Sequence, residues 1–188
     1  DFYTLKGVLE SLLKQLGITA NRLNYKENTM DVKNFHPYRS ACIYLGKELF
    51  GMMGEVHPAL VKQLGLPKGA VYAEIRLDLL MEVKLSKVKF KPIAKYPSVK
   101  RDIALVVKSD VQAASLSAVI SKAGKALVKN IEVFDVYEGE HVEAGYKSVA
   151  LSILYQADDH TLTDAEITAV HTTILTALEK QCGAVLRG

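Results

Sequence analysis

Basic side chains gather in one stretch of this 188-residue chain and could bind phosphate groups. Between Lys84 and Arg101 there are seven basic residues and no acidic one. They are Lys84, Lys87, Lys89, Lys91, Lys95, Lys100 and Arg101. Clustered cations bind nucleic-acid phosphates by releasing condensed counterions, an attraction that depends on salt rather than on base sequence. Taken alone, such a run is also typical of a solvated, lysine-rich linker.

The histidine and serine residues give little support for catalysis. His36 and His57 each precede a proline, which favours extended backbone, and neither has an acidic residue at metal-ligand or triad spacing. Ser40 lacks the strand-turn-helix context of a nucleophile elbow. The run Gly51-Met52-Met53-Gly54 lacks the features of a phosphate loop. A hydrolase using His36 or His57 is therefore a weak alternative, because neither a nucleophile nor an orienting acid is evident.

Composition and cysteine usage are typical of a folded cytoplasmic protein. Hydrophobic residues make up 49% and charged residues 24% of the chain, which argues against disorder. Cys42 and Cys182 lie far apart without zinc-site spacing, and we expect both to be reduced thiols. No apolar run is long enough for a membrane span and no signal peptide is recognisable. The chain begins at Asp1, directly before a predicted helix, which suggests a piece of a longer protein.

The length allows one large domain or two small ones, and charge distinguishes the two halves. Residues 1–92 carry 14 basic and 9 acidic residues, whereas residues 93–188 carry 10 and 12. Pro92 and Pro97 bracket a stretch in which lysine replaces the large apolar residues. We therefore predict a first domain over 1–82, a basic linker over 83–94 and a second domain over 95–188.

The first half predicts an antiparallel sheet with helices. Asp1 as a cap, apolar residues at helical spacing and Gly17 as a stop predict an opening helix. Two apolar runs on either side of Gly46-Lys47 predict a hairpin. The remaining predicted elements are a short strand over 22–25, a loop over 34–37, a helix over 58–65 and a strand over 71–78.

The second half predicts the order strand, helix, strand, strand, helix, strand. The predicted strands cover 102–107, 128–138, 146–156 and 184–186; one helix covers 116–123, and the other lies between Thr163 and Gly183. This is the split βαβ pattern of ferredoxin-like domains, a four-stranded antiparallel sheet with both helices on one face. Alternation predicts that Tyr137 shares a face with Ile131 and that Val136 lies on the opposite face. Small residues on one face of 146–156, such as Ser148 and Ser152, predict a half-open surface.

Ordered motifs in both halves carry a family resemblance. Those of the second half are Lys95-Tyr96-Pro97 with Arg101-Asp102-Ile103-Ala104, Phe134-Asp135-Val136-Tyr137-Glu138-Gly139, Gly145-Tyr146-Lys147-Ser148 and Leu162-Thr163-Asp164. They resemble the ferredoxin-fold anticodon-binding domain that ends the bacterial phenylalanyl-tRNA synthetase beta chain. The first half resembles the last part of the catalytic-like module of that chain. Its motifs are Phe35-His36-Pro37 with Arg39-Ser40-Ala41, Gly54-Glu55-Val56-His57-Pro58 and Tyr72-Ala73-Glu74-Ile75.

One residue departs from the family pattern. Tyr38 follows the first His-Pro pair, where the family usually has glycine. Glycine tolerates backbone conformations that tyrosine avoids, so the local backbone is of interest.

The resemblance implies an α+β protein that is part of an alpha-beta heterotetrameric ligase, which joins phenylalanine to its tRNA using ATP and Mg²⁺. The first domain would be a non-catalytic scaffold for the alpha subunit and the remainder of the beta chain. The second domain would contact the anticodon region of tRNA for phenylalanine. On this interpretation the fragment is catalytically inactive by itself, holds no cofactor or metal, acts in the cytoplasm and has no membrane partner.

The residues expected to contact RNA flank an open sheet face, where side chains can meet unstacked bases while cations hold phosphates. They are Lys95, Tyr96, Ser98, Lys100, Arg101, Lys147 and Ser148. Each has a structural alternative: Tyr96 could pack at the domain boundary, and Lys147 could pair with Glu132 across the sheet. Because residues 93–188 are slightly acidic, we expect weak RNA binding by the fragment alone.

A second class of function is a ferredoxin-like sensor that binds an amino acid at a strand-helix edge. Ferredoxin-like folds serve many functions, so the fold alone does not decide between the two. The chain lacks the glycine-rich loop that such a pocket would favour, and a sensor leaves the first half unexplained.

Overall fold

The computed structural model describes residues 1–85, 90 and 93–187, and Lys87, Lys89 and Lys91 of the basic run lie outside this part. The chain divides into two compact units, Asp1–Lys91 and Pro92–Gly188, which we treat separately. The predicted linker over 83–94 falls partly on residues outside the described part, so its boundaries stay a prediction.

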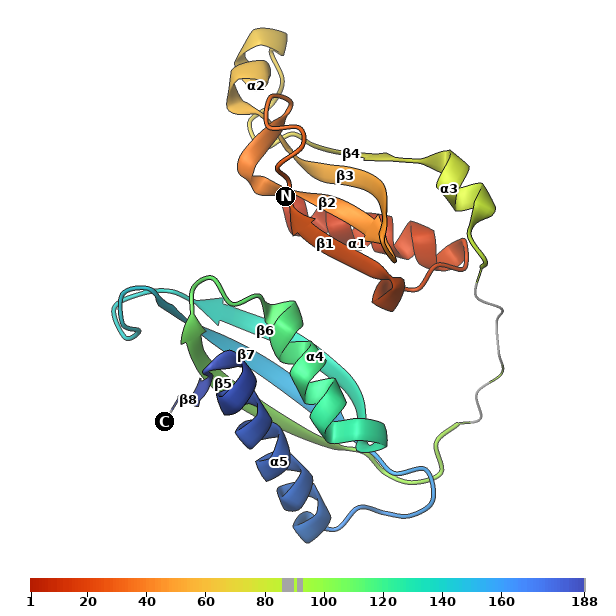
Figure 1. The fold of residues 1–188 in the computed structure, drawn as a ribbon, viewed down its shortest axis with the longest axis vertical. Helices are drawn as coiled ribbons and strands as arrows, with labels where there is room; N and C mark the ends of the chain where they lie inside the picture. The colour runs from red at the N-terminus through yellow and green to blue at the C-terminus, as the bar shows by residue number, and fades with distance from the viewer. Residues whose placement is uncertain (86–89, 91–92, 188) are drawn as a thin grey trace. The chain divides into compact units, whose positions relative to one another are not determined.

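The first unit is a four-stranded antiparallel sheet with α1 packed along one face (Figure 1). Its strand order is β1-β2-β3-β4. The elements are α1 (Phe2–Gln15), a 3₁₀ turn (Ala20–Arg22), β1 (Leu23–Glu27), β2 (Phe35–Leu45), β3 (Glu48–Val56), α2 (Pro58–Leu64), β4 (Val71–Ile75) and α3 (Leu77–Glu82).

Helix α1 forms as its sequence predicts. The Asp1 carboxylate accepts a hydrogen bond from the Thr4 backbone N–H at 2.9 Å, which satisfies one of the free amides of the first turn. On the inner face of the helix, Leu9 and Leu13 are buried against Ile43 and other sheet residues. Burial of a leucine side chain contributes roughly 1.5–3 kcal/mol, so this face fixes the helix on the sheet.

Two predictions for the first unit are wrong. The loop predicted over 34–37 is the start of β2, and Pro37 lies where the pairing with β3 is interrupted, between Phe35 and Ser40. Proline lacks an N–H and is tolerated in a strand at such an irregularity. The strand predicted over 71–78 ends at Ile75, because Leu77 begins α3 and is exposed to solvent.

The backbone at Tyr38 is ordinary. In the described part of the chain, Lys125 is the one residue other than glycine with a positive φ. Tyr38 lies within β2 with its ring exposed, so tyrosine at this position requires no strained backbone.

The second unit has the predicted βαββαβ order, which confirms the fold class. Its elements are β5 (Val99–Lys108), α4 (Ala113–Gly124), a 3₁₀ turn (Lys125–Leu127), β6 (Val128–Tyr137), β7 (Tyr146–Tyr155), α5 (Asp164–Cys182) and β8 (Val185–Leu186). The antiparallel sheet has the order β6-β7-β5-β8, and Figure 1 shows α4 and α5 on the same side of it. Leu105, Leu151, Ile120 and Ile174 are among the buried residues of the core between sheet and helices.

The ends of α5 also match the sequence prediction. Thr163 and Glu166 form the reciprocal capping box, and Gly183 ends the helix with a φ of 61°. These contacts hold the pKa of Glu166 at about 2, chiefly through hydrogen bonds from the backbone and hydroxyl of Thr163. The long helix is therefore fixed at both ends by local chemistry.

A bulge in β6 overturns the predicted side-chain faces. The pairing of β6 with β7 shifts between Val133 and Asp135, so Val136 pairs with Val149 and Tyr137 pairs with Ser148. Directly paired residues in an antiparallel sheet point to the same side. Tyr137 therefore lies on the face away from the helices, and Val136 lies on the helix side.

Close packing of β2 on β3 gives a test of the first unit. A Cβ atom added at Gly54 would lie 2.6 Å from both the carbonyl oxygen of Arg39 and the Cα of Ser40. We expect Gly54→Ala to lower the free energy of unfolding of this unit by about 1–3 kcal/mol or more, because backbone must move. The matched control is Gly7→Ala in α1, where nothing lies within 4 Å and alanine should stabilise by about 0.5–1 kcal/mol. Denaturant titration followed by amide signals of residues 1–85 measures both, and equal effects would contradict the packing described.

Candidate nucleic-acid interface

The side of the second unit's sheet that faces away from α4 and α5 is an open surface. In β5, the core residues Ile103, Leu105 and Val107 alternate with residues that point to this surface. The pairing of β5 with β7 shows which residues of the two central strands share it. They are Lys100, Asp102, Ala104, Val106 and Lys108 of β5, and Tyr146, Ser148, Ala150, Ser152 and Leu154 of β7.

Small side chains form the middle of this surface. Ala104 pairs with Ala150, and the Ser152 hydroxyl donates a hydrogen bond of 2.6 Å to the Asp102 carboxylate. Ser148 and Ser152 are only 4% and 3% exposed, although α4 and α5 of this unit lie on the other side of the sheet. Short side chains on central strands are shielded by their larger neighbours, so these two serines lie low in the middle of the sheet.

One aromatic and one basic side chain meet over this flat area. Tyr137 of β6 pairs with Ser148, and the backbone N–H of Arg187 donates to the carbonyl of Ala104 beyond the end of β8. The Arg187 guanidinium carbon lies 5.6 Å from the centre of the Tyr137 ring. Such a cation–π contact orients both groups, and both chemistries are used to bind nucleic-acid bases and phosphates.

The residues before β5 lie at one end of the open surface. Gln156 donates a side-chain hydrogen bond of 2.6 Å to the carbonyl of Tyr96, whose side chain is partly buried. Lys95, Ser98 and Lys100 are exposed there. This end therefore combines two cations with a turn that is fixed to the sheet.

Arg101 faces the helices. It pairs with Ile153 of the core, and its guanidinium lies 3.8 Å from the Asp164 carboxylate at the start of α5. Close to Arg101, the Tyr155 hydroxyl lies 2.9 Å from Nδ1 of His171. Burial lowers the pKa of His171, and the positive charge of Arg101 lowers it further. Burial also raises the pKa of Tyr155 to about 12.

Lys147 also lies off the open surface. It pairs with Val107, and its ammonium donates a hydrogen bond of 2.7 Å to the carbonyl of Ser109. Lys147 does not pair with Glu132, which lies opposite Ser152. Ser148 pairs with Val106, which is six residues from Lys100 along β5. The candidate RNA contacts near Lys100 therefore lie roughly 20 Å from those at Lys147 and Ser148.

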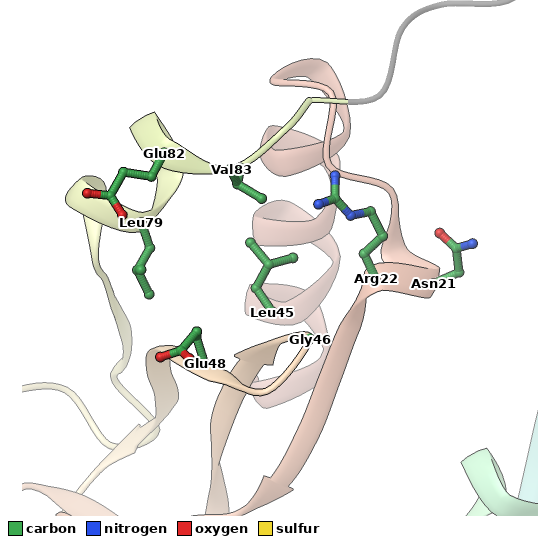
Figure 2. Close-up of a pocket in the computed structure, with 8 residues that line it drawn as sticks. All are labelled: Asn21, Arg22, Leu45, Gly46, Glu48, Leu79, Glu82 and Val83. Carbon is green, nitrogen blue, oxygen red and sulfur yellow. The ribbon is translucent and has the colours of Figure 1, made fainter.

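The first unit contains a separate cavity of about 480 Å³ with a mainly apolar interior. Figure 2 shows Leu45 and Val83 near its centre, Leu79 with Glu48 and Glu82 on one side, and Arg22 on the other. The Arg22 guanidinium donates a hydrogen bond of 2.8 Å to the carbonyl of Lys84. Two carboxylates and an engaged arginine make this cavity unsuitable for phosphate.

The described residues contain neither a helix suited to cross a membrane nor a cluster suited to hold a metal ion. Within residues 1–85, 90 and 93–187, no helix combines the length and apolarity needed to cross a membrane. Over the same residues, no group of three or more histidine, cysteine or acidic side chains is arranged to hold a metal ion.

Comparison with protein families assigns both units. Residues 94–187 match the family described as the ferredoxin-fold anticodon binding domain. The chain belongs to this family. Residues 1–77 match the phenylalanyl tRNA synthetase beta chain CLM domain. These matches confirm the resemblance that the sequence motifs predict for both halves.

Whole-chain relatives give the same result. The phenylalanine–tRNA ligase beta subunits of Geobacillus kaustophilus and Bacillus subtilis are 44% and 43% identical to this chain over 188 residues. Each alignment covers all of this chain but 23% of the relative, so the chain spans less than a quarter of their length. Similarity to a solved structure, Arabidopsis thaliana MSL1 A320V, has a TM-score of 0.28 at 12% identity over 96% of this chain and 60% of that one, too low to support an argument.

The seven residues predicted to contact RNA do not all lie on one face of the second unit's sheet. Lys100 and Ser148 lie on the open surface, and Arg101 and Lys147 lie on the helix side. Lys95, Tyr96 and Ser98 precede β5. Whether any of them binds RNA stays a prediction.

Sequence reasoning did not identify Tyr137 and Arg187 as parts of the surface. Simple alternation along β6 places Tyr137 on the same side as Ile131, and the bulge reverses that assignment. Arg187 follows a strand of two residues, which is too short to show alternation. The only available signal was the presence of an aromatic and a basic residue near the ends of two strands.

The location of Arg101 near His171 predicts that replacing Arg101 changes the pKa of His171. A role of Arg101 in RNA binding alone would predict no such change. Arg101→Ala removes a positive charge near His171, so we expect the pKa of His171 to rise toward its ordinary value of about 6.5. In the wild type this pKa is lower in the folded than in the unfolded state. The associated stability is therefore full above about pH 6.5, the pKa of the unfolded state, and is lost as pH falls from there through the lower pKa of the folded state.

Proton NMR titration of the His171 ring measures this change in the free protein, with Lys100→Ala as the matched control. An unchanged His171 pKa in Arg101→Ala would contradict the described location of Arg101.

Proposed function

We propose that this chain is part of a phenylalanine–tRNA ligase beta subunit and that its second unit binds the anticodon region of tRNA for phenylalanine. The observation that carries the proposal is 44% identity to such a subunit along all 188 residues. On this proposal the whole enzyme, an alpha-beta heterotetramer, charges the tRNA with phenylalanine. ATP and Mg²⁺ are used elsewhere in that enzyme, which acts in the cytoplasm, and this chain alone is catalytically inactive.

The open surface supplies the chemistry for binding unpaired bases. Its middle consists of small side chains, and the Tyr137 ring beside Arg187 offers a stacking partner for a base at the β6 side. Stacking of a base on an aromatic side chain contributes roughly 1–3 kcal/mol. Arg187 and Lys100 lie where they could hold phosphates on either side of the stacked base. Asp102 is turned toward Ser152 and is available to accept a hydrogen bond from a base amino group.

Affinity of the isolated chain for tRNA should be weak. Residues 93–188 carry two more acidic than basic side chains, so long-range attraction to RNA is small. We expect binding in the micromolar range or weaker, with most affinity supplied by the rest of the tetramer. A salt-titrated comparison of tRNA for phenylalanine with an unrelated tRNA tests the proposal. Sub-micromolar binding at physiological salt would contradict the weak-affinity part, and equal binding of both tRNAs would contradict the anticodon assignment.

Residue substitutions can locate the RNA on the open surface. We expect Tyr137→Ala and Arg187→Ala each to weaken binding of the specific tRNA by about tenfold, through lost stacking and lost phosphate contact. Lys100→Ala should reduce binding less, and Lys147→Ala should have little effect because its side chain points to the helix side. Lys147 is the matched control, and a larger loss for Lys147→Ala than for Tyr137→Ala would place the RNA elsewhere.

The first unit offers a surface for protein partners. Val8, Leu12 and Leu16 follow one another at intervals of four on the outer side of α1 and its end, and they are 63%, 48% and 40% exposed. Apolar residues at this spacing form a continuous stripe on a helix. Its simplest use is packing against the alpha subunit or the remainder of the beta chain.

Disrupting this stripe should separate assembly from folding. We expect the double substitution Val8→Glu, Leu12→Glu to leave the thermal unfolding of the isolated chain nearly unchanged, since both side chains are exposed. Capture of the alpha subunit, co-expressed with the remainder of the beta chain, should fall at least about tenfold. Lys14→Glu alone, on the same helix, changes the net charge by the same −2 and serves as the charge-matched control. Full capture by the double variant would show that this face has another role.

The amino-acid sensor receives no specific support from the second unit. The shallow cavity at its strand-helix edge, beside Leu105 and Leu175, has a volume of about 250 Å³, which is below the usual range of ligand pockets. A thermal-shift screen with amino acids distinguishes the two functions directly.

A further inference from the structure

Two sequence motifs of the first unit, which the RNA-binding proposal leaves unused, meet at one place. Arg39 belongs to β2 and Glu55 to β3, and the Arg39 Nε lies 2.7 Å from the Glu55 carboxylate. The strands come this close because Gly54, the partner of Ser40, has no side chain. His36, at the start of β2, completes the group.

The Arg39 guanidinium is oriented by Glu55 and lies beside His36. One of its terminal nitrogens lies 2.9 Å from Nε2 of His36, in addition to the contact with Glu55. Nδ1 of His36 accepts a hydrogen bond of 3.1 Å from the backbone N–H of Tyr38. A neutral imidazole has one acceptor nitrogen, so a ring that accepts from Tyr38 cannot also accept from Arg39. The terminal N–H groups of Arg39 are thus free for another acceptor, and the side chain is 55% exposed.

These residues line a cavity of about 710 Å³, which is within the ~300–1,000 Å³ range of small-molecule sites. Lys62 and Lys68 line it together with Arg39, and Glu55 is the acidic residue of the lining. Three cations against one carboxylate leave the cavity with a net positive charge, while apolar side chains of β3 and α2 form part of its wall. An anionic group with an organic substituent matches this lining.

We propose that this cavity binds a phosphoryl group, carried either by a small molecule or by RNA. Glu55 holds the guanidinium of Arg39 at its Nε, and the planar fork suits paired phosphate oxygens. Lys62 and Lys68 add two flexible point charges, which suits a group with more than one negative charge. This inference goes beyond the anticodon contact and does not rest on it, because the cavity belongs to the other unit.

The test uses the full 188-residue chain and three probes: inorganic phosphate, AMP and a short single-stranded RNA. We expect each probe to give saturable amide chemical-shift changes at Arg39, Lys62 and Lys68 in NMR titrations. The double substitution Lys62→Ala, Lys68→Ala should weaken binding at least about tenfold, and both side chains are exposed, so folding should be retained. Lys33→Ala, Lys47→Ala is the matched control and should bind as the wild type does.

Two further comparisons sharpen the result. Arg39→Lys keeps the charge but removes the fork, and it should weaken phosphate binding while Arg39→Gln weakens it more. Tighter, more salt-sensitive binding of RNA than of AMP identifies a nucleic-acid phosphate, and similar affinities identify a small phosphorylated molecule. The site is refuted if no probe gives saturable changes at the cavity, or if the control variant loses binding equally. We expect the Tyr137→Ala variant to retain the chemical-shift changes at Arg39, Lys62 and Lys68. Failure of the anticodon proposal can therefore be distinguished from failure of this one.

Discussion

The continuous pairing of β5 with β7 fixes which side chains of the second unit can reach a partner. Ten consecutive residue pairs join these strands without a register shift. Because side chains alternate across a strand, Lys100 and Arg101 point to opposite sides although they are neighbours in the sequence. The basic end of the motif is therefore divided: Lys100 joins the open surface, and Arg101 joins the environment of His171 beneath α5. A compact basic motif in the sequence need not be a compact basic site.

The edge strand β6 supplies what the central pairing cannot. Its bulge shifts the register by one residue, so that Tyr137 lies beside Ser148 on the open surface. Without this shift the ring would point to the helix side at the edge of the core. Bulges commonly redirect a side chain near a functional site, and here the redirected residue meets Arg187, which comes from the other edge of the sheet. The surface is thus assembled from both edges around a floor of small residues.

Local chemistry explains which parts of the fold were predictable from the sequence. The cap at Asp1, the capping box of Thr163 with Glu166 and the stop at Gly183 depend on residues within one turn, and each forms as predicted. The start of β2 was missed because Pro37 indicates a loop unless the interruption in pairing with β3 is known. The helix α3 was missed because Ile75 and Leu77 alternate as a strand would.

For the candidate surface, the fold class and the open face followed from the pattern, but its aromatic and basic partners depended on a bulge and on a two-residue strand.

The separation of charge between the units constrains how RNA could be bound. The basic excess belongs to residues 1–92, whereas the anticodon-binding-family unit is slightly acidic. At physiological salt, exposed charges act over about 8 Å, so distant lysines contribute little to a base held on the open surface. Contacts there must then depend mainly on stacking, hydrogen bonds and the shape of the floor, with few phosphate contacts. Such contacts discriminate between bases, whereas phosphate contacts mainly set affinity and position. A weakly charged surface of this kind is suited to recognising a sequence that other parts of an assembly have already brought near.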